Sequence, residues 1–165
     1  MSTSIGYEHL KAIYFLKEAQ AKTPLAASSA YILPLMAMQS ARLAIEEYVD
    51  QIGRKVDAAW DKTNWLDAPI QEQLAHLLQR MGYTLNPEKN VWKEVLTLFE
   101  MADSIQGNLA EMQKLYRDEI PEQIKDLAVE YPIYRSQVIA EEAIDLLLDM
   151  SEVSNKVKTN VSQTK

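Results

Sequence analysis

The sequence predicts an all-α protein, an antiparallel helical bundle of four or five main helices with short accessory helices. Apolar residues recur at helical spacing along most of the chain, and no segment shows the sustained alternation of a strand. The nineteen residues from Thr23 to Ala41 carry no charge, and the charges that follow from Arg42 to Gly53 occupy one side. A helix that is apolar all round is buried, so this segment is expected to be the central helix.

The first two helices follow from apolar periodicity and from proline and glycine positions. The first is expected at residues 5–21, with Ile13 and Leu16 on its inward face. The second carries the uncharged run and ends near Gly53. Pro34 is expected to start or kink this second helix, because proline has no N–H to donate to the helical ladder.

Capping residues locate the next two helices. Asp67 is a good N-cap for a short helix entered through Pro69 and closed at Gly82. Asn86 followed by Pro87 repeats this start signal and opens a longer helix. Gly107 is expected to weaken that helix midway, since an interior glycine costs about 1 kcal/mol relative to alanine.

The C-terminal part adds two more helices. Pro121 and Pro132 bracket a short helix, and the final helix is expected to span residues 133–153. Residues 155–165 are polar and are expected to be a disordered tail. A chain of 165 residues suits one domain with its own core. We therefore expect a single helical domain over residues 1–154.

Composition narrows the possible functions. The net charge of −7 argues against nucleic acid as a partner, because phosphate neutralisation by Lys and Arg supplies most of that affinity. The absence of cysteine excludes disulfides, thiolate metal sites and a cysteine nucleophile, and fits a reducing cytoplasm. Prolines and polar residues interrupt the uncharged run, which disfavours a membrane span. The sequence thus predicts a soluble cytoplasmic protein without a membrane anchor.

Two acidic pairs suggest one enzymatic alternative. Glu47-x-x-Asp50 and Glu142-x-x-Asp145 are similar to the carboxylate pairs that hold Mg²⁺ in all-α nucleotide pyrophosphohydrolases of the MazG kind. Each residue advances about 100° around a helix, which places both pairs opposite the apolar stripes of their helices. A metal site in a bundle needs inward carboxylates. Solvated helix faces are therefore expected, and a Mg²⁺ site is the alternative.

Other catalytic residue types are sparse. His9 falls within the apolar stripe of the first helix and is expected to be a core or interface residue, while His76 is expected to be exposed. The serines lack a Gly-x-Ser-x-Gly elbow, and the four scattered glycines build no phosphate-binding loop. The sequence therefore indicates no catalytic residue.

Aromatic residues gather around the short helix that follows Pro69. Trp60, Trp65 and Trp92 are the candidates for a ligand or partner site, since tryptophan lines pockets and anchors interfaces. The alternative is that they pack connections onto the bundle.

Several of these motifs together resemble those of the HEPN-like helical superfamily. They are the small-residue helix running from Ser40 to Ile52, Trp60-Asp61 in the following link, Pro69-Ile70, and Asn86-Pro87 leading to Trp92. The resemblance covers residues 27–150. Active members carry an arginine, a polar residue and a histidine on a later helix, where residues 102–107 read Ala-Asp-Ser-Ile-Gln-Gly. The resemblance thus implies a member without the ribonuclease motif, acting by dimerisation or partner binding.

These inferences favour a non-catalytic interaction or regulatory domain that forms a homodimer and needs no cofactor. The apolar stretch with Tyr31, Leu35 and Met38 is expected in the dimer interface or the core, because it exceeds what one small domain readily hides. The alternatives are a Mg²⁺-dependent nucleotide pyrophosphohydrolase and a helical bundle that binds a small ligand. The sequence identifies no protein partner.

Overall fold

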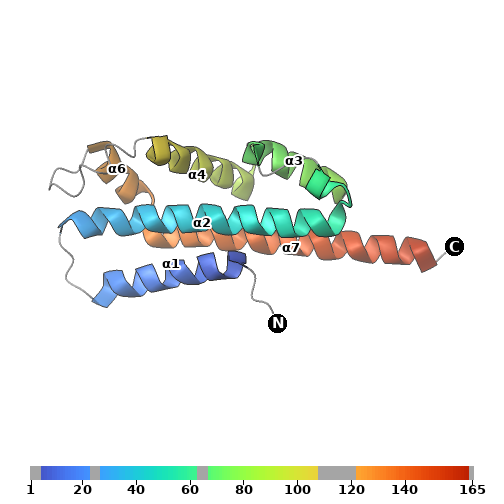
Figure 1. Ribbon diagram of the computed structural model, residues 1–165, viewed down its shortest axis with the longest axis horizontal. Coiled ribbons are helices and arrows are strands. Elements are labelled where there is room, and N and C mark those ends of the chain that lie inside the picture. The colour runs from blue at the N-terminus through green and yellow to red at the C-terminus, as the bar shows by residue number, and fades with distance from the viewer. Residues whose placement is uncertain (1–4, 23–26, 63–66, 108–121, 164–165) are drawn as a thin grey trace.

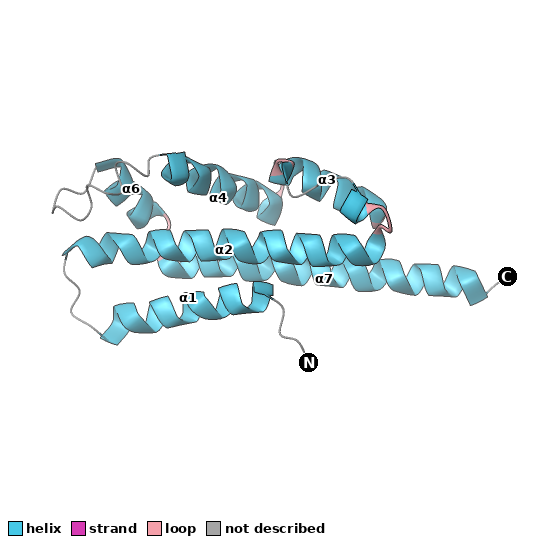
Figure 2. Cartoon of the chain, in the orientation of Figure 1, coloured by secondary structure: helices cyan, strands magenta, loops and turns pink. Residues whose placement is uncertain are grey.

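The computed structural model describes residues 5–22, 27–62, 67–107 and 122–163, and every regular element in these ranges is a helix (Figure 2). The elements are α1 (Ile5–Lys22), α2 (Ala27–Val56), the 3-10 helix η1 (Trp60–Lys62), α3 (Ile70–Arg80), α4 (Asn90–Gly107), α6 (Glu122–Glu130) and α7 (Ile133–Gln163). The all-α prediction is confirmed. None of these helices combines the length and apolar character needed to cross a bilayer.

The two longest helices, α2 and α7, form the centre of the molecule (Figure 1). They lie against each other and run in the same direction, while α1 runs antiparallel to both along one side. On the other side α3, α4 and α6 follow one another along α2, and α4 also contacts α7. The bundle therefore has a parallel central pair covered on two sides.

The inward-facing residues between Leu35 and Ala41, in the second half of the uncharged run, lie in the core. Ala37, Met38 and Ala41 have no exposed surface, and Leu35 is 2% exposed. The buried stripe continues along α2 and joins residues of α1, α3, α4 and α7 in one cluster, with the following at its centre: Ile13, Ile45, Val49, Leu77, Leu98 and Leu147. Burial on this scale outweighs the weak helix propensity of the segment around Pro34.

Pro34 does not start the second helix, which was one of the two roles expected of it. It lies inside α2, which begins at Ala27, and it is buried. An interior proline costs about 3 kcal/mol through its missing N–H and its clash with the preceding turn. The fully buried neighbours Ala37 and Met38 pack only if the helix continues through this point, and their burial offsets that cost.

The sequence predicted the starts of α3 and α4 too early in the chain. Pro69, in an extended conformation, is the N-cap of α3 and makes no side-chain cap bond, so Asp67 is not the cap. Asn86 begins a turn, in which its side chain accepts the backbone N–H of Glu88 at 3.0 Å, and α4 begins only at Asn90. Asparagine and aspartate favour such local turns as readily as helix caps. The predicted stop at Gly82 is confirmed, because this glycine has a φ of +89°.

The C-terminal half differs from the expected helix bounds. The described part of α4 extends to Gly107, and residues 108–121 lie outside the described residues. The predicted disordered tail at 155–165 is helical as far as Gln163, ten residues beyond the expected end at Val153. No proline or glycine occurs between Ile133 and Gln163, so nothing in the sequence stops the helix. The short helix between Pro121 and Pro132 is confirmed as α6.

Candidate functional site

Trp60 is a packing residue at the corner between α2 and α3. Its side chain is 2% exposed, and its indole Nε1–H donates to Asp50 Oδ1 at 2.9 Å. The ring lies so close to Gly53 that a Cβ at residue 53 would fall 2.3 Å from it. Glycine is therefore required there by the close approach of the indole. For Trp60, the structure supports packing rather than an open ligand site.

Asp57 organises the same corner. Its carboxylate is buried and accepts three hydrogen bonds, from His76 Nε2 at 2.8 Å, Arg80 Nη2 at 3.3 Å and the Ala59 N–H at 3.0 Å. These contacts lower the pKa of Asp57, chiefly through the His76 hydrogen bond and then the Ala59 N–H, against the raising effect of burial. The aspartate thus ties α3 to the end of α2. We call Asp57, Trp60, His76 and Arg80 the Asp57 corner.

Sequence reasoning missed the Asp57 corner. His76 was expected to be exposed, but it is half-buried between Asp57 and the Trp60 ring, whose centroid lies 5.9 Å from that of the imidazole. The available signal was the spacing of His76 and Arg80, which places two donors one turn apart on one helix face. A carboxylate to receive them was not identified, because Asp57 lies in a connection.

The acidic residues of the proposed Mg²⁺ site have separate environments. Asp50 was expected on the solvent side of α2, but it is only 9% exposed, and Arg54 Nε lies 3.0 Å from its Oδ2. The 3-10 turn carries Trp60 over it, which the helical period does not reveal. Glu47 accepts a hydrogen bond from Gln51 at 3.4 Å, and Glu142 and Asp145 are exposed on α7. Across the described residues, no three carboxylate or histidine side chains group as metal ligands.

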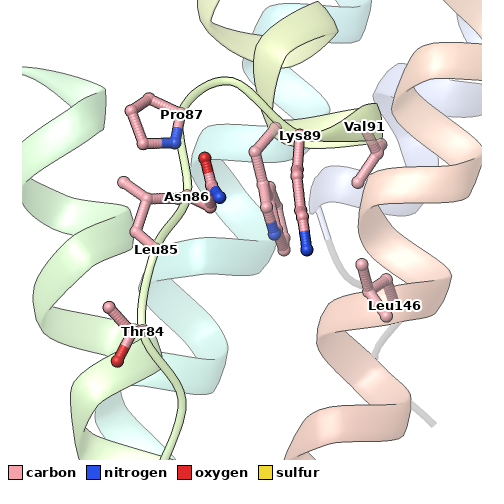
Figure 3. Close-up of a pocket in the computed structure, with 8 residues that line it drawn as sticks. Thr84, Leu85, Asn86, Pro87, Lys89, Val91 and Leu146 are labelled. Atoms are coloured by element: carbon pink, nitrogen blue, oxygen red, sulfur yellow. The ribbon is translucent and has the colours of Figure 1, made fainter.

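Trp92 borders an open groove between the α3–α4 connection and α7 (Figure 3). The cavity has a volume of about 600 Å³, and Leu146 of α7 lies on the side opposite Thr84 and Leu85. Trp92 itself is only 6% exposed, so its ring forms part of the wall. Trp60 does not line this groove, and Trp65 lies outside the described residues. The structure therefore does not bring Trp60 and Trp92 together in one site.

The candidate dimer or core residues divide between two environments. Leu35 and Met38 belong to the core of their own chain. Tyr31 is half-buried, with Lys125 Nζ of α6 6.0 Å from its ring centroid. Leu35 and Met38 are therefore core residues, and a dimer stays a prediction.

Residues 102–107, where the resemblance would place a ribonuclease motif, include one partner of an ion pair between α4 and α2. Asp103 of α4 forms an ion pair with Arg42 of α2, whose Nε also lies 3.2 Å from Glu46 Oε1. The Arg42 guanidinium covers the Phe99 ring at 5.4 Å from its centroid. The arginine next to this segment thus comes from another helix, and two carboxylates compensate its charge. It joins α2 to α4.

A smaller groove lies between α1 and α7. It has a volume of about 200 Å³ and is lined by Tyr7, Leu10, Lys11, Tyr14 and Glu141. The Tyr14 hydroxyl donates to Glu141 Oε1 at 2.6 Å. This hydrogen bond and the negative charge of Glu141 raise the pKa of Tyr14. Sequence analysis did not identify this groove, although Tyr7 and Tyr14 are spaced two helical turns apart.

Comparison of the chain with protein-family models, with curated proteins and with solved structures found no match. The resemblance to the HEPN-like superfamily accordingly stays a prediction.

Proposed function

We propose that this chain is a non-catalytic interaction domain that acts as a homodimer. The observation that carries the proposal is the outward face of α2. Met36 is 49% exposed and Leu43 43% exposed, although this helix lies at the centre of the bundle. Residues seven apart lie on the same helix face, so the two side chains form one short apolar stripe.

The stripe suits a contact between two copies related by a twofold axis. Such an interface uses the same patch on both subunits, and burying the exposed half of each Met36 and Leu43 side chain contributes about 1 kcal/mol. Ser40 lies between them in the sequence, and its small side chain permits close approach of a second helix. Methionine adapts its shape to an irregular neighbour. These properties support a helix-to-helix contact.

The family resemblance supports the same proposal. It implies a HEPN-like member that lacks the arginine and histidine of the ribonuclease site and acts through dimerisation or partner binding. The absence of cysteine supports a reducing compartment, and we propose a cytoplasmic location on that basis.

Sedimentation velocity over a range of concentrations tests the dimer. The unmodified chain is expected to sediment as a dimer, and Met36→Glu with Leu43→Glu is expected to make it monomeric, because charges would be buried without partners. Val129→Glu is the matched control, since this residue of α6 is 74% exposed and should leave the dimer intact. Circular dichroism verifies that each variant is folded. A strict monomer at the highest concentration overturns the proposal.

A second candidate function is binding of a small ligand, which the groove beside Trp92 favours because of its volume. Quenching of tryptophan fluorescence across a panel of small aromatic and apolar compounds tests it. If the groove binds a ligand, the quenching is lost in Trp92→Phe and retained in Trp60→Phe. Quenching that survives Trp92→Phe assigns the ligand elsewhere.

A further inference from the structure

The outward face of α7 carries a regular stripe of apolar and acidic side chains. Its members follow one another at spacings of four and three residues: Tyr134, Val138, Glu141, Asp145, Leu148 and Glu152. Tyr134 is 60% exposed, Val138 41% and Leu148 38%. Every charge in the stripe is negative, and the exposed Glu142 and Asp149 extend the acidic character. We call these six residues the α7 stripe.

Helix α1 adds aromatic surface beside the α7 stripe. Tyr7 and Tyr14 are about half exposed and line the groove between α1 and α7. From Ile5 to Ala21 of α1, the exposed Glu8 and Glu18 offset the exposed Lys11 and Lys17. The combined surface is therefore aromatic and apolar with a net negative charge.

Glu141 is held in place where the two helices meet. Its Oε1 accepts the Tyr14 hydroxyl at 2.6 Å and the Gln137 amide at 3.2 Å, so the carboxylate is ordered before any partner arrives. Gln137 is 8% exposed, and its carbonyl oxygen has no hydrogen-bond partner among the described residues. Glu141 thus lines the groove as an oriented carboxylate, whereas the Gln137 carbonyl is buried and does not line it. An oriented carboxylate favours a donor that carries positive charge.

We propose that the α1–α7 face binds a basic amphipathic helix of another protein. Tyr134 and Val138 are four residues apart and Leu148 follows ten residues later, with Glu141 and Asp145 between them on the same face. A basic amphipathic helix lying along this stripe would meet apolar side chains at both ends and carboxylates in the middle. Lysine or arginine beside those residues would meet the carboxylates of the stripe, and a cation over Tyr7 or Tyr14 gains from the ring quadrupole. From Tyr134 to Glu152 the stripe extends about 27 Å at 1.5 Å per residue, the length of an 18-residue helix.

Charge distinguishes this partner from two others. A second copy that docked by the same face would bring acidic stripes together, which is destabilising. An anionic membrane surface would repel the stripe in the same way. The inference extends the proposed interaction function, but it uses α1 and α7 rather than Met36 and Leu43 of α2. Peptide binding and self-association can therefore fail independently.

Titration calorimetry of the full chain with a synthetic 18-residue helix of leucine and lysine tests the proposal. Its leucines are spaced at three and four residues, and a peptide with glutamate in place of lysine is the control. The lysine peptide is expected to bind, more weakly as salt rises, and the glutamate peptide is not. Sedimentation of the same samples reports the dimer separately.

Two double variants with the same change in net charge separate a site from general attraction. Glu141→Gln with Asp145→Asn is expected to weaken the lysine peptide roughly tenfold. Asp126→Asn with Glu130→Gln, on exposed positions of α6, is expected to change it less than about twofold. Tyr14→Ala should weaken binding even in high salt, because it removes apolar contact.

Three results overturn the proposal. One is equal weakening by both double variants, which indicates non-specific attraction. Another is no binding of the lysine peptide by a folded chain. The third is binding to phosphatidylserine vesicles that competes with the peptide, which assigns the face to a membrane.

Discussion

His76 Nε2 lies 2.8 Å from Asp57 Oδ2 and joins the middle of α3 to the end of α2. The two residues are nineteen positions apart, and the turn between them carries Trp60 over Asp50. A buried carboxylate is stable in its charged form only with such donors around it. The geometry of the whole corner therefore depends on the ionisation of one aspartate.

The Asp57 corner predicts acid sensitivity. The pKa of Asp57 is lowered from 3.8 in the folded chain, so its stabilising contribution is fully present above pH 3.8 and is lost as pH falls through the folded value. Asp57→Asn is expected to lower stability near neutral pH and to flatten its decline in acid. Urea unfolding across the acid range measures both effects. Asp61→Asn, at an exposed position, is the control, and an unchanged acid limb in Asp57→Asn would contradict the assignment.

Gly53 predicts a steric clash. In Gly53→Ala the added Cβ would fall 2.3 Å from the Trp60 ring, and overpacking of this kind costs about 1 to 3 kcal/mol. Alanine otherwise favours a helix interior, so a loss of stability isolates the clash. In the background of Trp60→Leu the same substitution should cost less. Thermal unfolding of the four chains forms a double-mutant cycle, and additivity would show that the two residues do not interact.

Truncating two methionines of α2 is expected to have very different effects on stability. Met38→Ala removes a fully buried side chain and is expected to cost about 2 to 5 kcal/mol. Met36→Ala, two residues earlier and 49% exposed, should change the stability of the monomer by less than about 0.5 kcal/mol. Denaturant unfolding of dilute samples compares them. Equal losses of stability in the two variants would contradict the burial of Met38 and the exposure of Met36.

Ser136 predicts a gain in stability. Its side chain is fully buried, and its hydroxyl has no hydrogen-bond partner among the described residues. Ser136→Ala removes this unsatisfied group and is expected to stabilise the chain by about 1 kcal/mol. Ser151→Ala, at another buried serine of the same helix, provides the comparison. If Ser136→Ala loses stability and Ser151→Ala does not, the Ser136 hydroxyl makes a hydrogen bond, which contradicts the prediction.

Tyr14 predicts a shifted alkaline titration. Glu141 raises its pKa above 10.0, so Glu141→Gln should return the pKa toward 10.0. The neutral phenol is favoured in the folded chain, and the stability from this contact is lost as pH rises through the folded pKa. Chemical shifts of the Tyr14 ring during a pH titration measure it. If Glu141→Gln leaves the titration of Tyr14 unchanged, the hydrogen bond between Tyr14 of α1 and Glu141 of α7 is contradicted.

The sequence was most informative where burial follows a helix period. The uncharged run identified α2 because few arrangements other than the core accept nineteen residues without charge. Leu74, Leu77 and Leu78 likewise mark the buried face of α3. The starts of α3 and α4 were harder to predict from the sequence, because aspartate and asparagine, here Asp67 and Asn86, favour turns as readily as helix caps.

The candidate sites were harder to predict than the helices. Asp50 is polar by sequence and lies away from the apolar stripe, yet a turn ten residues later covers it with Trp60. Asp57 and His76 meet only through tertiary structure. The groove at Tyr14 and Glu141 joins residues 127 positions apart, which no local pattern reports. Local periodicity therefore indicates which residues are buried, but not which distant residues meet.

The parallel pairing of α2 and α7 has a consequence for synthesis on the ribosome. Helix α1 precedes α2 and can cover it at once, but α7 begins only at Ile133. At 5 to 20 residues per second, the 77 residues from Val56 to Ile133 take about 4 to 15 s to be made. Through that interval, α2 lacks a neighbour that its apolar surface needs. The nascent chain therefore presents the apolar surface of its central helix to chaperones before its fold is complete.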